Sequence, residues 1–179
     1  MVRHDPFDSL SLTDLEEASG ELHRRIGAAL RRIGELRAER DDGAGNTPRR
    51  RVAALAAAIE LACSTLGAAG AGGAALDVRS DRHPAVIAAV MYATPSIPAL
   101  LARLDQDRRL LASLSRSLEP RLAEAYVTPW GHEALRRLLS EIAVAEPARC
   151  AQALERRLFV LEAEAEAAAR SVASREPDR

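Results

Sequence analysis

Apolar residues recur every three or four positions along most of the chain, and this spacing limits the fold more than any other feature of the sequence. It places apolar side chains on one face of an α-helix, whereas a half-buried strand requires strict alternation of apolar and polar residues. The few β-branched residues are scattered and form no alternating run. The sequence therefore predicts an all-α fold without β-strands, a helical bundle of about five to six helices.

The two longest predicted helices lie at the two ends of the chain. The first runs from Thr13 to Arg40, and Thr13 and Glu16 have the spacing of a capping box at its start. The last begins at Pro147. Their apolar stripes are expected to be interaction faces, paired antiparallel within the bundle or extended past the core in a dimer. The residues chosen for these faces are Leu22, Ile26, Ile33, Leu154, Leu158 and Leu161.

Three glycines recur every seven residues along the first predicted helix, at Gly20, Gly27 and Gly34. The repeat keeps them near one face, although glycine costs up to about 1 kcal/mol relative to alanine inside a helix. Two interpretations remain open. The glycines are either tolerated on the surface, or they form a groove in which the backbone of another helix comes close.

Four shorter helices are expected between these two. Thr47 and Pro48 have the pattern of a helix start, and that helix ends in a Gly/Ala-rich loop at 67–76, which is either a hinge or a linker. A short helix is expected at 84–93 and a longer one at 98–118. Asp107 interrupts the leucine seam of the longer helix. Thr128 and Pro129 repeat the helix-start pattern, so another helix is expected there.

The length of 179 residues fits one domain. We expect a loose leader at 1–12, a single helical domain at 13–173 and a frayed tail at 174–179. The leader lacks the apolar segment of a signal peptide. The least polar stretch consists mainly of Ala and Gly and contains Glu60, which favours a buried helix over a membrane span. Cys63 and Cys150 are expected as small apolar residues in a reducing, cytoplasmic compartment.

Charge and motif searches point to no catalytic residues, metal site or cofactor. All 25 basic residues are arginines, as in a GC-rich genome, and the net charge of −1 creates no general attraction for nucleic acid. None of the four histidines has another histidine four residues away, and there is no Cys-x-x-Cys pair. Glu60 lies four residues before Ser64 in an apolar setting that could raise its pKa, which leaves open a buried catalytic acid.

The segment around the only tryptophan is the most distinctive in the chain. Trp130 and His132 lie at the expected helix start, where a small anion could bind with the help of Arg136 or Arg137. Alternatively, residues 122–129 are similar to the first half of a helix-turn-helix, with Arg136 and Arg137 on the recognition helix. In a purely structural alternative, Trp130 packs the start of the helix onto the core.

These patterns favour a non-enzymatic helical protein for protein–protein interaction, of the scaffold or adaptor type, that self-associates through amphipathic helices. The expected partner is another protein or a second copy, rather than nucleic acid or a membrane. The first alternative is a DNA-binding or ligand-responsive transcriptional regulator. The second is a small helical enzyme with a buried acid.

Overall fold

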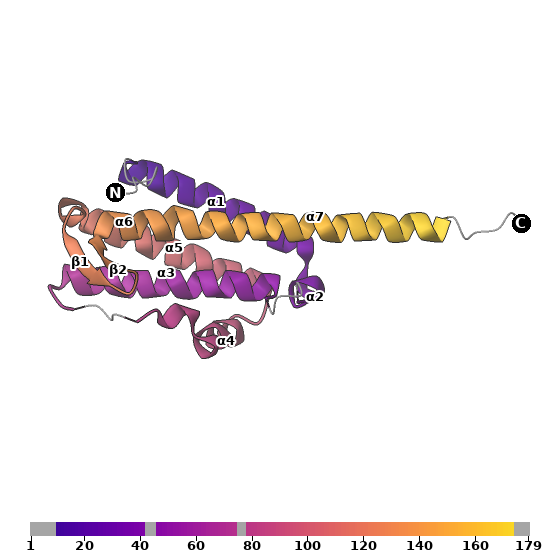
Figure 1. Ribbon diagram of the computed structural model, residues 1–179, viewed down its shortest axis with the longest axis horizontal. Coiled ribbons are helices and arrows are strands. Elements are labelled where there is room, and N and C mark those ends of the chain that lie inside the picture. The colour runs from indigo at the N-terminus through magenta and orange to yellow at the C-terminus, as the bar shows by residue number, and fades with distance from the viewer. Residues whose placement is uncertain (1–9, 42–45, 75–77, 174–179) are drawn as a thin grey trace, which may run out of the picture.

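The computed structural model describes residues 10–41, 46–74 and 78–173 (Figure 1). Most of them are helical, which confirms the predicted all-α bundle with a long C-terminal helix. Most of the predicted leader, residues 75–76 of the predicted loop and the predicted tail lie outside the described residues.

The order of elements begins with α1 (Leu12–Ile33), α2 (Glu35–Ala38) and α3 (Pro48–Gly70). The middle of the chain holds a 3₁₀ turn (Ser80–Arg82), α4 (Pro84–Ala93), α5 (Ile97–Ser117) and a second 3₁₀ turn (Glu119–Arg121). The last part holds β1 (Ala125–Thr128), β2 (Gly131–Ala134), α6 (Leu135–Ser140), a π-helical turn (Glu141–Ala145) and α7 (Glu146–Ala173).

Four long helices form the bundle, and α1 and α7 run in the same direction. Arg25 donates to Glu155 at 2.8 Å and Arg32 to Glu162 at 2.5 Å, so both ion pairs join residues 130 positions apart. A constant offset between the paired positions requires parallel helices, as Figure 1 shows. The predicted antiparallel pairing of the first and last helices is therefore wrong.

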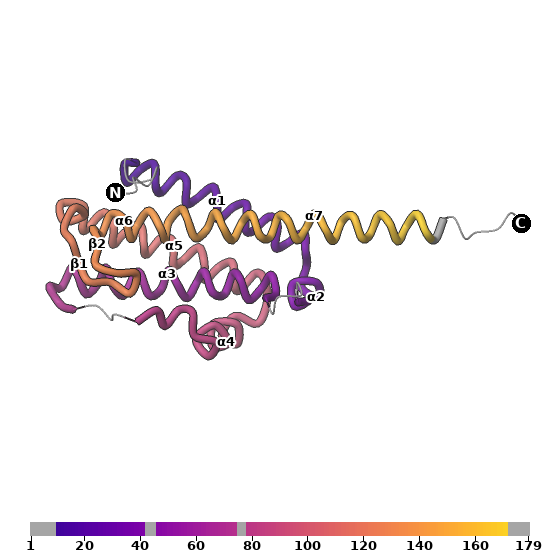
Figure 2. Tube along the Cα trace, in the orientation of Figure 1, coloured from indigo at the N-terminus to yellow at the C-terminus, as the bar shows by residue number. Residues whose placement is uncertain are grey.

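Two parallel helices that follow one another in the chain need a long connection, because the chain must return to the end at which the first one began. The segment that contains α4 carries the chain back along the bundle between α3 and α5, which are also parallel (Figure 2). After α5, the β-hairpin reverses the chain at the end of the bundle where α1 begins. Helix α7 therefore runs in the same direction as α1. Bundles with such long crossovers keep the usual helix packing while changing the order of directions.

Helix α3 lies at the centre of the bundle, as its almost uniformly apolar sequence predicts. It packs against α4, α5 and α7. By length and composition, α3 could cross a membrane, as could α4 and α5 taken together across a bend of 111°. For α3, 72% of the apolar window is buried inside the bundle, and core helices pass the same test.

The bounds of α1 differ from the predicted ones at both ends. Ser11, and not Thr13, caps the helix: its hydroxyl accepts from the Asp14 amide at 3.1 Å, and its amide donates to the Asp14 carboxylate at 2.9 Å. Gly34 ends the helix in a backbone conformation with φ 78°, which favours glycine. The predicted continuation to Arg40 is thus interrupted, and Leu36 is 87% exposed.

Helix α3 continues to Gly70, past the predicted end at Gly67, because two further small residues extend it before Gly72 adopts φ 70°.

At the other end of the chain, Pro147 does not begin a separate helix. Residues 135–173 form one helical run with the π turn just before the proline. A proline ring clashes with the carbonyl four residues earlier, and a wider turn relieves that clash.

Residues 125–134 form a β-hairpin, which contradicts both the prediction of no strand and the predicted helix start at Thr128. Val127 pairs with His132, and Thr128 pairs with Gly131. The Thr128 hydroxyl accepts from the Trp130 amide at 3.1 Å and donates to the Gly131 carbonyl at 2.9 Å. Gly131 has φ 129°, a conformation that L side chains rarely adopt and that this turn requires.

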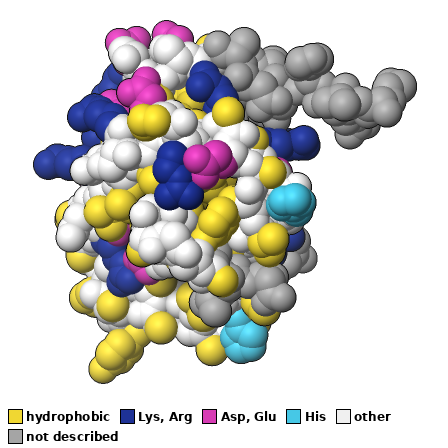
Figure 3. All heavy atoms as spheres, turned by 90° about the vertical axis from the view of Figure 1, so that its left-hand side faces the viewer, with side chains coloured by type: hydrophobic (Ala, Val, Ile, Leu, Met, Phe, Trp, Pro, Cys, Tyr) yellow, Lys and Arg dark blue, Asp and Glu magenta, His cyan; other side chains and the backbone are white. Residues whose placement is uncertain are grey.

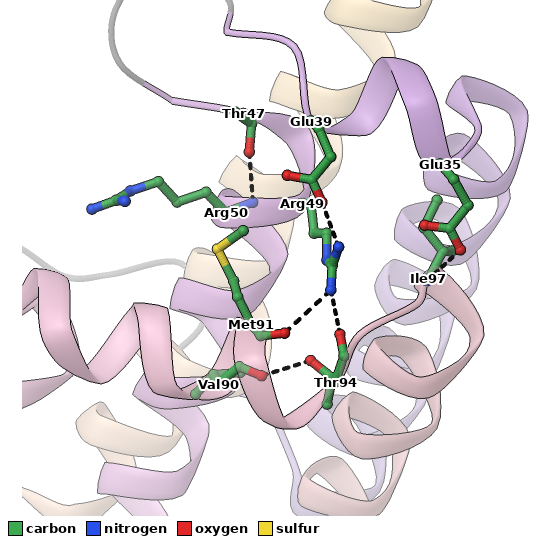
Figure 4. A network of polar contacts seen from close by, with 9 residues as sticks. All are labelled: Glu35, Glu39, Thr47, Arg49, Arg50, Val90, Met91, Thr94 and Ile97. Atoms are coloured by element: carbon green, nitrogen blue, oxygen red, sulfur yellow. Dashed lines mark hydrogen bonds and ion pairs between the residues drawn. The ribbon is translucent and has the colours of Figure 1, made fainter.

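Arg49 fixes the turn between α4 and α5 (Figure 4). Its guanidinium donates to the carbonyls of Met91 at 3.2 Å and Thr94 at 2.5 Å, and it is also ion-paired with Glu39. Glu35 accepts from the Ile97 amide at 2.7 Å and so binds the first turn of α5. These contacts attach the α4 crossover to the α2 end of the bundle.

Replacing Arg49 should therefore destabilise the fold. For Arg49→Gln, we expect the free energy of unfolding to fall by about 2 kcal/mol, because two partly buried carbonyls lose a charged donor. Urea unfolding followed by circular dichroism measures the change. Arg50→Gln is the matched control, since the Arg50 side chain points away from this cluster (Figure 4) and its loss should be close to neutral. Equal stability of the two variants would contradict the role of Arg49.

Candidate functional site

The six residues predicted as interaction faces lie inside the bundle. Leu22, Ile26 and Ile33 of α1 and Leu154, Leu158 and Leu161 of α7 are all buried, with exposed fractions of 9% or less. They belong to one hydrophobic core in which α1 packs along α7. In this chain the two stripes cover one another, so neither is presented on the surface.

The same helix α7 has an exposed extension beyond this seam. From Glu162 to Ser171 every residue is exposed, and Figure 1 shows α7 projecting past the end of α1 and the rest of the bundle. Just before the extension, Phe159 is 74% exposed and Val160 is 43% exposed. We call residues 162–171 the α7 arm. Sequence periodicity alone could not find its start, because the apolar stripe continues through it without a change of spacing.

Trp130 packs against an arginine, and it does not begin a helix. The guanidinium carbon of Arg79 lies 4.5 Å from the centre of the indole ring, within the range of a cation–π contact. Trp130 is half-buried and packs on the hydrophobic core, and its indole N–H is buried without a hydrogen-bond partner among the described residues. The alternative that Trp130 packs the helix entry onto the core is thus right about the packing, but Trp130 lies in a hairpin turn and not at a helix start.

The other residues of the predicted anion site are distributed over the hairpin and α6. His132 is exposed on β2, and Arg137 on α6 is ion-paired with Glu133 at 3.3 Å. Arg136 lies next to Arg137 on α6, and its amide donates to the Leu122 carbonyl at 2.9 Å. Because residues 131–134 form β2 and α6 begins only at Leu135, no helix starts at Trp130 to bind an anion or to enter a DNA groove.

Charge is mixed on the hairpin end of the molecule. Figure 3 faces this end and shows arginines and acids interspersed with apolar side chains. A nucleic-acid surface usually concentrates positive charge on one face. The mixture agrees with the balanced composition of 25 basic and 26 acidic residues.

The metal-ligating residue types are not gathered in the described part of the chain. Among residues 10–41, 46–74 and 78–173, no group of three or more His, Cys, Asp or Glu could hold a metal ion. Cys63 and Cys150 are free, buried thiols, and desolvation raises the pKa of each to about 12. Such thiols behave as small apolar residues rather than as nucleophiles.

Glu60, predicted as a buried acid, is only partly buried and forms an ion pair. Its side chain is 35% exposed and accepts from Arg103 Nε at 2.6 Å. The Ser64 hydroxyl donates to the Glu60 backbone carbonyl at 3.0 Å, so it does not bond to the carboxylate in the way a nucleophile would. The structure thus brings Glu60 together with an arginine of α5, and not with Ser64.

The acid with a strongly raised pKa is instead Asp107 on α5, next to Glu60. Burial is the main cause, followed by the negative charge of Glu60, and together they raise the pKa of Asp107 to about 7. One carboxylate oxygen of Asp107 is buried without a hydrogen-bond partner among the described residues. The sequence held a signal for this position, since Asp107 is the acid that interrupts the leucine seam of α5.

Comparisons with known proteins add no functional assignment: no family model matches the chain, and no curated protein or solved structure is significantly similar to it.

The raised pKa of Asp107 makes stability depend on pH. The folded state binds the proton more tightly than the unfolded state, whose aspartate has the ordinary pKa of 3.8. The free energy of unfolding should therefore decrease as the pH rises from about 4 to about 7. At pH 8, Asp107→Asn should be more stable than the wild type by about 1 to 2 kcal/mol, a value reduced for partial exposure. Thermal unfolding across this pH range measures the effect.

Asp105→Asn provides a control of opposite sign. Hydrogen bonds from Arg108 and Arg109 lower the pKa of Asp105, so its contribution to stability is present at neutral pH and is lost in acid. We expect this variant to be less stable than the wild type at pH 8. A pH profile of Asp107→Asn identical to that of the wild type would show that Asp107 ionises normally.

Proposed function

We propose that the protein is a helical interaction protein of the scaffold or adaptor type, and that it self-associates through the α7 arm of one copy and a groove between α1 and α5 of another. The observation that carries this proposal is the uncovered arm. A helix exposed on all sides gains little from packing, and arms of this kind bury area when a second chain covers them.

The arm continues the stripe that α1 recognises within the same chain. Leu154, Leu158 and Leu161 are followed by Ala165 and Ala168, at alternating spacings of four and three residues. Since α1 ends at Gly34, it covers this stripe only as far as Leu161. The part beyond it consists mainly of alanines, which allow another backbone to come close.

The groove between α1 and α5 has the complementary shape. It is a cavity of about 300 Å³ whose α1 side includes Gly20 and Gly27, two of the three glycines with seven-residue spacing. A Cβ atom at Gly20 would meet nothing within 4 Å, so the backbone is open to a neighbour there. No helix of the described chain lies in this place, so the helix backbone predicted to come close to these glycines is proposed to be that of another copy.

The charges of the two surfaces are also complementary. The arm carries three glutamates and one arginine, a net charge of −2, and of these glutamates Glu162 is ion-paired with Arg32 of α1, whereas Glu164 and Glu166 lie further along the arm. The ionised groups of the groove are three arginines and one aspartate, a net charge of +2: Arg24, Arg31, Arg108 and Asp105. The opposite charges of arm and groove speed their association. The like charges of two arms, or of two grooves, oppose pairing between identical surfaces.

Reciprocal charge reversal tests this pairing. We expect the wild-type protein to dimerise in a concentration-dependent way, as measured by sedimentation equilibrium at protein concentrations up to about 1 mM. Arg24→Glu with Arg31→Glu, and separately Glu164→Arg with Glu166→Arg, should each weaken the dimer at least about tenfold. An equimolar mixture of the two double variants should associate again, because each supplies the charge that the other lacks.

Arg37→Glu with Arg40→Glu is the matched control, because both arginines are exposed and lie outside the groove. This double variant should dimerise like the wild type. A wild-type protein that stays monomeric over the whole concentration range would refute self-association. Association that is unchanged in both reversed variants would place the contact on another surface.

A further inference from the structure

We propose that a second, separate cavity, between α3, the 3₁₀ turn at Ser80–Arg82 and the start of α7, binds a small anionic molecule that carries a phosphate group or carboxylate groups. The cavity is half-open and has a volume of about 330 Å³. This is the size range of small-molecule sites. The inference is independent of the proposed self-association, since the cavity shares no residue with the α1–α5 groove.

Arginines from three separate parts of the chain meet around this cavity. Arg51 comes from the second turn of α3, Arg79 and Arg82 come from the 3₁₀ turn and the residue before it, and Arg149 comes from the first turns of α7. Guanidinium groups match phosphate and carboxylate oxygens with paired hydrogen bonds and keep their charge at every physiological pH. Their convergence points to an anionic ligand.

The Arg79 side chain is held in place before any ligand binds. It donates to both carboxylate oxygens of Asp81, at 2.8 and 2.7 Å, and Asp81 is only 3% exposed. Trp130 covers its guanidinium from the hairpin at 4.5 Å. A fixed donor loses less conformational entropy on binding than a free surface arginine, which favours binding of an anion at this position.

Arg149 is held in a similar way, by Glu141 and by Glu146, the latter at 3.1 Å. The lining contains four arginines and two acids, Asp81 and Glu146, and Glu141 beside it also pairs with Arg149. The arginines therefore outnumber the acids at this site, and the imbalance favours an anionic ligand over a neutral or cationic one.

The floor of the cavity is apolar and includes Ala58, Ile87 and Cys150. Ile87 and Cys150 are 7% and 9% exposed. An apolar floor beneath a charged rim fits a ligand with a small organic body as well as an anionic group. Phosphate and carboxylate groups both present negatively charged oxygen atoms to guanidinium groups, and this shared chemistry defines the ligand class. Titration with a phosphate probe and with a carboxylate probe distinguishes between the two.

Titration with inorganic pyrophosphate and, separately, with citrate tests this site at constant ionic strength. Because Trp130 is the only tryptophan and lies over Arg79, its fluorescence should change and reach saturation on binding. Isothermal titration calorimetry measures the same binding without depending on the fluorophore. For Arg51→Gln with Arg82→Gln, the dissociation constant of the bound probe should rise at least about tenfold.

Arg50→Gln is the matched control, because it removes one positive charge from the same turn of α3 without touching the cavity lining. Its dissociation constant should stay within about twofold of the wild-type value. Tighter binding of pyrophosphate would indicate a phosphate ligand, and tighter binding of citrate a carboxylate ligand. The proposal would be overturned if neither probe bound below about 10 mM, or if the double variant bound as tightly as the Arg50→Gln control.

Discussion

The packing of α1 along α7 in parallel register determines most of the architecture. Leu22, Ile26 and Leu154 are buried in a seam, and the ion pairs of Arg25 and Arg32 with α7 fix its register at a constant offset. Two adjacent parallel helices cannot be joined by a tight turn, so the chain must travel back along the bundle between them. Helices α3 and α5, which are joined by the α4 crossover, run in the opposite direction, and the β-hairpin then reverses the chain before α6 and α7. The same register leaves α7 longer than its partner and so produces the arm.

Arginine has several distinct functions in this protein, although the chain uses it for every basic residue. Arg49 is almost buried and binds backbone carbonyls of the α4–α5 turn, so its role is structural. Its neighbour Arg51, two positions along α3, lines a cavity. Arg25 and Arg32 lie at the rim of the apolar seam and select its register. A planar group with five donors can serve all these roles, and its position in the fold decides which one it serves.

Buried charge is concentrated where α3 meets α5. Glu60 has an arginine partner, while burial and the negative charge of Glu60 raise the pKa of Asp107 beside it to about 7. Sequence reasoning selected Glu60 because it interrupts an apolar helix. It did not select Asp107, which interrupts an equally apolar seam, because the difference between them depends on Arg103, a residue 43 positions from Glu60 in the sequence.

The helical class, the apolar faces and several helix starts follow from the order of the residues alone, because these features depend on contacts within a few residues. Thr47 caps α3 as its pattern predicts. Thr128 is also followed by proline, yet it begins a hairpin turn, since Trp130 packs on Arg79 and Gly131 adopts a left-handed conformation. Only the tertiary structure decided helix directions, the hairpin, the buried partner of each stripe and the meeting of arginines around one cavity. These features depend on contacts between residues far apart in the chain, which local periodicity does not encode.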